Sequence, residues 1–109
     1  MSNDVLVALA ATIHARRTGP ADVSYTRQLL DAGPERCARK FGEEAIEVVI
    51  AALGTDKKAL TGEAADVIYH LLVVLESCGV AWTDVAVTLA ARMGTSGLVE
   101  RAARPLKIE

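Results

Sequence analysis

Apolar residues recur along this chain at the three- to four-residue spacing typical of amphipathic helices, and breaker residues separate the periodic segments. The first segment ends at Gly19-Pro20 and the second closes at Gly33-Pro34. Longer segments end at Gly54 and at Gly79. The pattern therefore predicts helices over residues 6–17, 25–33, 34–53, 56–78 and 83–93.

Residues that favour helix starts stand where these segments begin. Ser24 precedes the second segment, Pro34 opens the third, and either Thr55 or Asp56 can cap the fourth. The alternation expected of strands does not extend over any useful length. We therefore expect an all-α fold, an antiparallel helical bundle of about five helices joined by short connections. Residues 1–94 would form the domain, and residues 95–109 a short C-terminal helix and tail of the same domain.

The composition adds an expectation about assembly. The chain has 109 residues, of which 51% are hydrophobic, and only four are aromatic. One small domain has too high a surface-to-volume ratio to bury that much aliphatic surface. We expect a homodimer that completes the bundle, with the helix over 56–78 at the two-fold axis. The residues expected at this interface are Ile68, Leu71, Leu72, Val74 and Leu75.

Charge and cysteine usage exclude several classes of protein. The formal net charge is −2, which argues against a nucleic-acid surface. The longest uncharged apolar run in the strong helices, residues 67–75, is too short to span a membrane. Cys37 and Cys78 match no zinc or redox spacing, and we expect reduced thiols in a cytoplasmic protein.

Five carboxylates interrupt the most apolar part of the chain. No Lys or Arg lies between residues 42 and 53 or between 62 and 79. Within each predicted helix the acids are spaced i, i+3, so they share one face, and the short connection makes the two helices antiparallel neighbours. The two acidic faces can therefore meet. The acids are Glu43, Glu44, Glu47, Glu63 and Asp66.

Such a cluster requires either protons or a cation. The repulsion among four converging carboxylates is comparable with the stability of a whole domain. Oxygen-only ligands select Mg²⁺, with Mn²⁺ possible, and we expect Glu44, Glu47, Glu63 and Asp66 to be the metal ligands. A di-iron bundle would need Glu-x-x-His, which neither His14 nor His70 provides. The simpler alternative is that these acids only keep an apolar helix face hydrated.

The acidic motif, GluGlu-x-x-Glu followed after fifteen residues by Glu-x-x-Asp, resembles that of the all-α nucleotide pyrophosphohydrolases, the MazG-like superfamily. Within that group, SYTRQLL at 24–30, KFGEEAIE at 40–47 and EAADVIYHLLVVL at 63–75 are similar to the phosphoribosyl-ATP pyrophosphatases of histidine biosynthesis. The resemblance covers roughly residues 6 to 104. It implies Mg²⁺-dependent hydrolysis of phosphoribosyl-ATP to phosphoribosyl-AMP and pyrophosphate by paired subunits. The alternative is a house-cleaning nucleoside triphosphate pyrophosphohydrolase of the same superfamily.

The resemblance also suggests roles for individual residues. Glu43, Glu44 and Glu47 are the candidate catalytic residues, with Glu43 either orienting a water or acting as base. Structural alternatives are an ion pair for Lys40, a helix cap for Ser24, Tyr25 and Thr26, and a core or interface position for His70. Four arginines are available for phosphates or are simply solvated: Arg16, Arg17, Arg36 and Arg39. The candidate substrate-binding residues are Lys40, Arg16, Tyr25, Thr26 and His70.

Overall fold

The computed structural model of this chain describes residues 3–21 and 24–93. Within these ranges the chain forms five α-helices and one short 3-10 helix, without a strand, so the all-α prediction is confirmed. The predicted C-terminal helix and tail, residues 95–109, lie outside the described residues. The elements are α1 (Asn3–Ala15), η1 (Arg16–Thr18), α2 (Tyr25–Ala32), α3 (Pro34–Ala52), α4 (Lys57–Ser77) and α5 (Trp82–Met93).

Side-chain caps fix the starts of two helices. The Ser24 hydroxyl accepts a hydrogen bond from the Arg27 backbone N–H at 3.0 Å, as expected at the start of α2. Asp56, rather than Thr55, caps α4: one of its carboxylate oxygens accepts from two backbone N–H groups of the first turn, at 3.0 and 3.1 Å. These caps satisfy backbone N–H groups of the first turns of α2 and α4.

Two glycines provide the sharp breaks between helices. Gly33 separates α2 from α3 with φ of 99°, and Gly79 follows α4 with φ of 77°. Both values lie in the left-handed region, where a side chain would be strained. The predicted boundaries differ most at α1, which begins at Asn3, ahead of its first periodic apolar residue, and tightens into η1 at its end.

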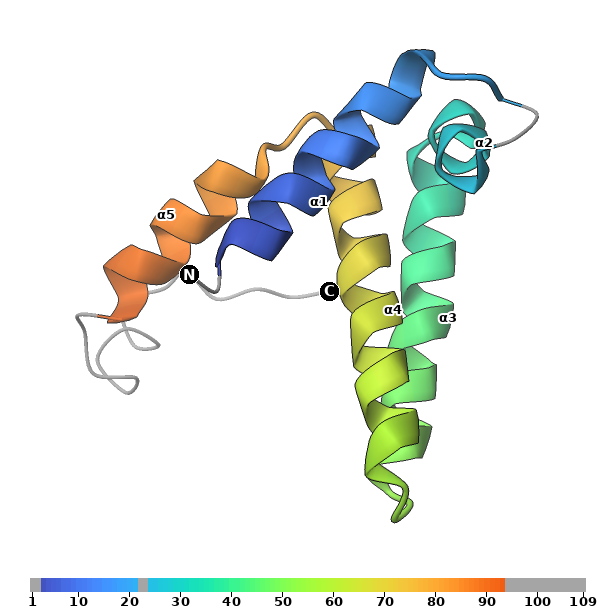
Figure 1. Cartoon of the computed structure of the whole chain (residues 1–109), viewed down its shortest axis with the longest axis vertical. Coiled ribbons are helices and arrows are strands. Elements are labelled where there is room, and N and C mark those ends of the chain that lie inside the picture. The colour runs from blue at the N-terminus through green and yellow to red at the C-terminus, as the bar shows by residue number, and fades with distance from the viewer. Residues whose placement is uncertain (1–2, 22–23, 94–109) are drawn as a thin grey trace.

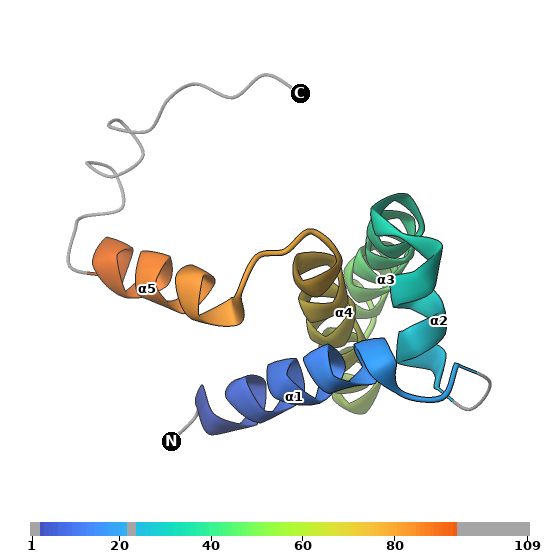
Figure 2. The same ribbon diagram turned by 90° about the horizontal axis from the view of Figure 1, so that it is seen from above.

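Helices α3 and α4 form an antiparallel hairpin that is the longest part of the molecule (Figure 1). Helix α2 lies across one end of α3, and α1 crosses α4 in the half of the hairpin nearest α2. Helix α5 turns away from the hairpin and lies beside α1 (Figure 2). The other half of the hairpin therefore projects without cover from α1, α2 or α5.

The core is small and lies where four helices meet. It consists of one residue each from α1, α2 and α3 and two consecutive residues from α4, all at most 3% exposed. Leu6, Leu9 and Trp82 pack around this cluster. The core residues are Ile13, Leu29, Cys37, Leu72 and Val73.

The location of the exposed apolar surface corrects one prediction. Leu72 was expected at a dimer interface but is 3% exposed inside this chain's own core, because α1 crosses over that part of α4. Val74 and Leu75 also pack against the core, which leaves Ile68 as the exposed member of the expected set. The continuous apolar face lies instead on the projecting half of α3, where side chains are 55–85% exposed: Ile46, Val49, Ile50 and Leu53.

No single helix in the described ranges is long and apolar enough to cross a membrane. The pair α4 and α5 passes the same test of length and composition together, but the two helices are bent by 114° at the break between them.

Candidate functional site

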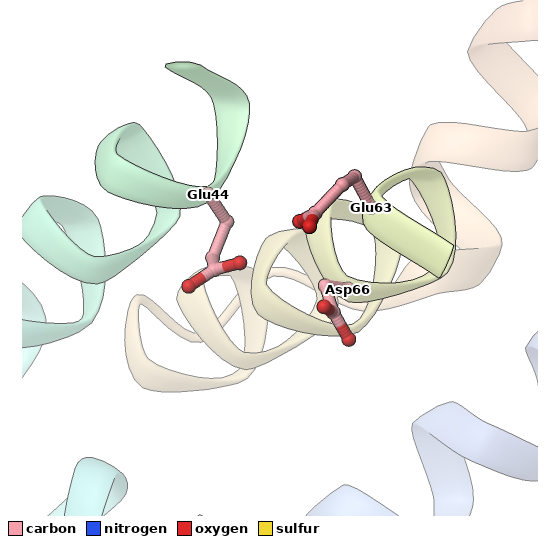
Figure 3. A group of neighbouring side chains, drawn as sticks. All are labelled: Glu44, Glu63 and Asp66. Atoms are coloured by element: carbon pink, nitrogen blue, oxygen red, sulfur yellow. The ribbon is translucent and has the colours of Figure 1, made fainter. Parts of the chain in front are cut away.

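The acidic residues of the hairpin meet between α3 and α4 (Figure 3). Glu44 extends from α3 toward α4, and Glu63 and Asp66 extend from successive turns of α4. Each of the three offers a carboxylate oxygen, and these oxygens all lie within 4.8 Å of one another. Three of the four residues predicted as metal ligands are therefore brought together.

The other two acids lie beside this group. Glu47, predicted as the fourth ligand, is exposed one turn after Glu44 and is outside the set of oxygens within 4.8 Å. Its charge nevertheless acts on Glu63. Glu43 projects into solvent, where its carboxylate lies 3.7 Å from the Lys40 ammonium.

The electrostatics of the cluster favour a cation. Burial raises the pKa of Glu63, and the carboxylates of Asp66, Glu47 and Glu44 raise it further. Neither Glu63 nor Asp66 pairs with a Lys or Arg in the described part of the chain. An all-carboxylate donor set with excess negative charge suits a hard divalent cation such as Mg²⁺ or Mn²⁺. The residues present therefore fit the metal that the sequence predicts.

Lys40 stands at the edge of the cluster, one turn before Glu44 on α3. Its ammonium lies 3.5 Å from the Glu44 carboxylate and is partly shielded from solvent. The pKa of Lys40 is raised, mainly by the ionisable hydroxyl of Tyr25 and then by Glu43 and Glu44. Both the ion-pair alternative and the phosphate-binding hypothesis for Lys40 are compatible with this position.

An aromatic group lies between the carboxylates and α2. The His70 ring meets Tyr69 edge-on at a centroid distance of 4.9 Å and Tyr25 at 6.1 Å. His70 is only 6% exposed, and its Nδ1 has no hydrogen-bond partner in the described residues. Burial lowers the pKa of His70 more than Glu44 raises it, so the ring is neutral at pH 7. Tyr25 is half exposed above it.

Thr26 and Arg16 occupy the far end of this group. The Thr26 hydroxyl is buried and hydrogen-bonded to the Tyr69 hydroxyl at 2.5 Å, which joins α2 to α4. In this arrangement Thr26 positions Tyr69 rather than facing solvent. Arg16 lies in η1, exposed, where its charge acts on Tyr69.

Sequence reasoning missed two features near the site. Tyr69 was not among the predicted site residues, although it lies three residues after Asp66 and therefore on nearly the same face of α4. Arg17 was considered available for phosphates, but its Nε donates to the Glu76 carboxylate and its Nη2 to the Glu76 carbonyl. His14 Nδ1 lies 2.9 Å from the same carboxylate. No local signal identifies this contact, because it joins residues about sixty positions apart.

Comparison with known proteins identifies the family. A family model described as phosphoribosyl-ATP pyrophosphohydrolase matches residues 6–93. The phosphoribosyl-ATP pyrophosphatase of Roseobacter denitrificans is 54% identical over 99 residues, covering 91% of this chain and 94% of that protein. That of Ruegeria pomeroyi is 54% identical over 101 residues, covering 93% and 96%. Phosphoribosyl-ATP pyrophosphatase 1 of Rhodopseudomonas palustris is 51% identical over 104 residues, covering 95% and 97%.

The matched region, residues 6–93, contains all of the acidic cluster, the aromatic group and Arg16. The resemblance predicted from the sequence motifs is thereby confirmed. This chain belongs to the phosphoribosyl-ATP pyrophosphohydrolase family.

Proposed function

We propose that this protein hydrolyses phosphoribosyl-ATP to phosphoribosyl-AMP and pyrophosphate in a Mg²⁺-dependent reaction, the second step of histidine biosynthesis. The observation that carries the proposal is the set of three carboxylate oxygens within 4.8 Å, contributed by two helices of the family's matched region. Water adds to the α-phosphorus, the α–β anhydride bond breaks, and pyrophosphate leaves.

The proposed metal ligands are Glu44, Glu63 and Asp66, with Glu47 as the fourth. A divalent cation bound there supplies charge neutralisation for the phosphates and a lower pKa for bound water. The helices that carry these residues belong to one hairpin, so the donor set is held on rigid elements. Glu47 lies one turn after Glu44 on α3, and its charge acts on Glu63, which supports its place as the fourth ligand.

The remaining residues orient the substrate and move a proton. Lys40, beside Glu44, is placed to contact a phosphate oxygen. Glu43 is the exposed carboxylate next to the cluster that is not among the proposed ligands, and it can accept the proton of the attacking water. The neutral His70 ring, with an unpartnered Nδ1 next to Tyr25, is available for a hydrogen bond to the nucleotide.

A coupled assay for pyrophosphate tests this function. Purified protein with Mg²⁺ is expected to release pyrophosphate from phosphoribosyl-ATP and to turn over dATP, dGTP, dCTP and dTTP far more slowly. Chelation of the metal should abolish release. Comparable or faster turnover of the deoxynucleotides would instead assign the house-cleaning activity.

We also propose that the working unit is a homodimer, with the apolar face of α3 as part of its interface. This face consists of Ile46, Val49, Ile50 and Leu53, each more than half exposed. The radius of gyration is 15.8 Å, larger than the roughly 13 Å of a closed domain of this length. A second copy packed on the projecting hairpin would cover the face and close the bundle.

Sedimentation of an Ile50→Glu variant tests the interface. A buried charge at this position should shift the protein to monomer or unfold it, because an apolar subunit interface cannot accommodate an unpaired carboxylate. Ala38→Glu introduces the same charge at an exposed position in the N-terminal half of α3, away from the projecting end, and should remain dimeric. A folded, active wild-type monomer at micromolar concentration would refute the proposal.

The proposed compartment is the cytoplasm. Cys37 and Cys78 are both free thiols, which suits a reducing environment, and Cys37 uses its thiol to donate to the Leu29 carbonyl.

A further inference from the structure

Arg16 differs from its neighbour Arg17 and from Lys40 because it has no acidic partner in the described part of the chain. Its neighbour Arg17 is bound to Glu76. Lys40 lies within 3.7 Å of the Glu43 carboxylate and closer still to Glu44. A guanidinium that carries its charge without a partner, next to a group of functional side chains, is suited to bind an anion from outside the chain.

The backbone around Arg16 is fixed on both sides. Ile13, one turn earlier, is 1% exposed, so Arg16 leaves the end of the same face of α1 that packs on the core. Arg17 ties the next residue to α4 through Glu76. Arg27 of α2 donates to the Gly19 carbonyl just after η1. The η1 turn, which carries Arg16, therefore follows α1 where the end of that helix passes α4 and approaches α2 (Figure 2).

Packing and charge connect Arg16 to the rest of the site. The η1 turn that carries Arg16 packs against α2, the helix of Tyr25 and Thr26. The Arg16 charge also opposes the rise that burial causes in the pKa of Tyr69. Tyr69 is held by Thr26 and its ring meets His70. The His70 ring in turn meets Tyr25.

This row of side chains, from Arg16 through Tyr69 and His70 to Tyr25, ends at the acidic cluster. Tyr25 interacts electrostatically with Lys40, and the Lys40 ammonium lies 3.5 Å from the Glu44 carboxylate. The rings of Tyr25, His70 and Tyr69 therefore lie between two sites suited to bind phosphate. One is the acidic cluster with its proposed cation, and the other is Arg16. A ligand that carries phosphate groups at both ends of a sugar and base would fit this order.

We propose that Arg16 recognises the phosphate monoester of the phosphoribosyl group, the part of the substrate that ATP lacks. Arg16 is then a specificity-determining residue. A guanidinium matches the oxygens of a terminal phosphate with two parallel hydrogen bonds, and both bonds disappear when that phosphate is absent. This inference rests on the proposed hydrolysis of phosphoribosyl-ATP.

The test compares phosphoribosyl-ATP with the same nucleotide after removal of the phosphoribosyl phosphate. Arg16→Ala should lower kcat/KM for phosphoribosyl-ATP by roughly 10- to 100-fold and leave kcat/KM for the dephosphorylated nucleotide within about twofold of wild type. Arg16→Lys, which keeps the charge, should recover part of the loss. Arg39→Ala, an exposed arginine of α3 that lies 3.8 Å from Glu35, is the matched control and should behave as wild type with both nucleotides.

Several results would overturn the inference. They are an equal loss with both nucleotides, no loss with either, or a wild-type enzyme that does not distinguish the two. A wild type that releases no pyrophosphate from phosphoribosyl-ATP would instead refute the proposed function. If the Arg16 variants fail to fold, inhibition of the wild type decides: ribose 5-phosphate should compete with substrate and ribose should not, and equal effects of the two would reject the role of Arg16.

Discussion

The two halves of α4 carry carboxylates in opposite surroundings. In the N-terminal half, Glu63 and Asp66 face Glu44 across the hairpin, and they have no basic partner within the described ranges. Near the C-terminal end, Glu76 accepts hydrogen bonds from Arg17 and lies 2.9 Å from His14 Nδ1. The same residue type is thus placed once among like charges and once among opposite charges, 13 residues apart on one helix.

The pKa directions follow this difference. Burial and neighbouring carboxylates raise the pKa of Glu63. Burial also raises the pKa of Glu76, but hydrogen bonds from Arg17 and His14 outweigh it, and the net pKa is lowered. A carboxylate paired within the chain stabilises the fold, whereas an unpaired cluster is stabilised by a cation from solution. We therefore expect Glu76 to act in structure and the hairpin acids to act in metal binding.

Substitution in the hairpin cluster should have the largest effect. Glu44→Gln and Asp66→Asn are each expected to lower kcat about a thousandfold. Each would remove a ligand of the proposed metal ion, whose charge stabilises the transition state. Without metal, both variants should be as stable as wild type or more so, since each relieves repulsion. Steady-state pyrophosphate release and thermal melting in chelator measure the two effects.

Glu35→Gln is the matched control, because Glu35 is an exposed acid on α3 with only a 3.8 Å contact to Arg39. It should keep wild-type activity. Near-normal kcat for Asp66→Asn at saturating Mg²⁺ would show that the hairpin acids are not ligands.

Mg²⁺ itself should have the next largest effect. A cation that binds only the folded state adds about 2.7 kcal/mol at a hundred times its Kd, which corresponds to a rise in Tm on the order of 10 °C for a domain of this size. Glu76→Gln should show the same Mg²⁺-induced rise in Tm from a lower starting Tm. In Glu44→Gln the rise itself should be much smaller. A wild-type Tm that does not move across millimolar Mg²⁺, with activity present, would mean that the metal arrives with the substrate.

Loss of the Glu76 contact should have the smallest effect. Glu76→Gln is expected to lower the free energy of unfolding by about 1 kcal/mol at pH 7, because Arg17 is partly exposed and water screens the pair. Activity should stay within about twofold of wild type. Chemical denaturation of both proteins measures the difference.

The pH dependence of that difference follows from the lowered pKa of Glu76. The stabilisation is fully present above the ordinary value of 4.5 and is lost as the pH falls through the lowered folded-state pKa. The wild type and Glu76→Gln should therefore converge in stability below pH 4.5. An equal gap at pH 7 and in acid would show that Glu76 contributes through packing instead.

Local signals predicted most of the fold. Helical periodicity and the breaks at Gly33 and Gly79 gave the helices and their order, and Ser24 capped α2 as expected. The i, i+3 spacing and the short Gly54-Thr55 connection placed the acidic faces opposite each other. These features depend on residues close together in the sequence, which is why they were predictable.

Contacts between distant elements were not predictable. Spacing put Glu47 on the acidic face, but spacing within one helix does not show which turn of α3 faces Glu63 and Asp66; in the structure it is the turn of Glu44. Leu72 was expected at an interface because the sequence does not show that α1 crosses α4 there. Likewise, the sequence does not show that Arg17 rather than Arg16 pairs with Glu76, because Glu76 is 59 residues from Arg17.

Direct titration of Mn²⁺ into the substrate-free protein, followed by the electron paramagnetic resonance signal of the free ion, tests the central claim most directly. The account predicts saturable binding by the wild type, unchanged binding by Glu76→Gln, and a Kd at least tenfold weaker for Asp66→Asn. Binding that survives Asp66→Asn and Glu44→Gln but is lost in Glu76→Gln would contradict it, because the cation would then occupy the end of α4 assigned to structure.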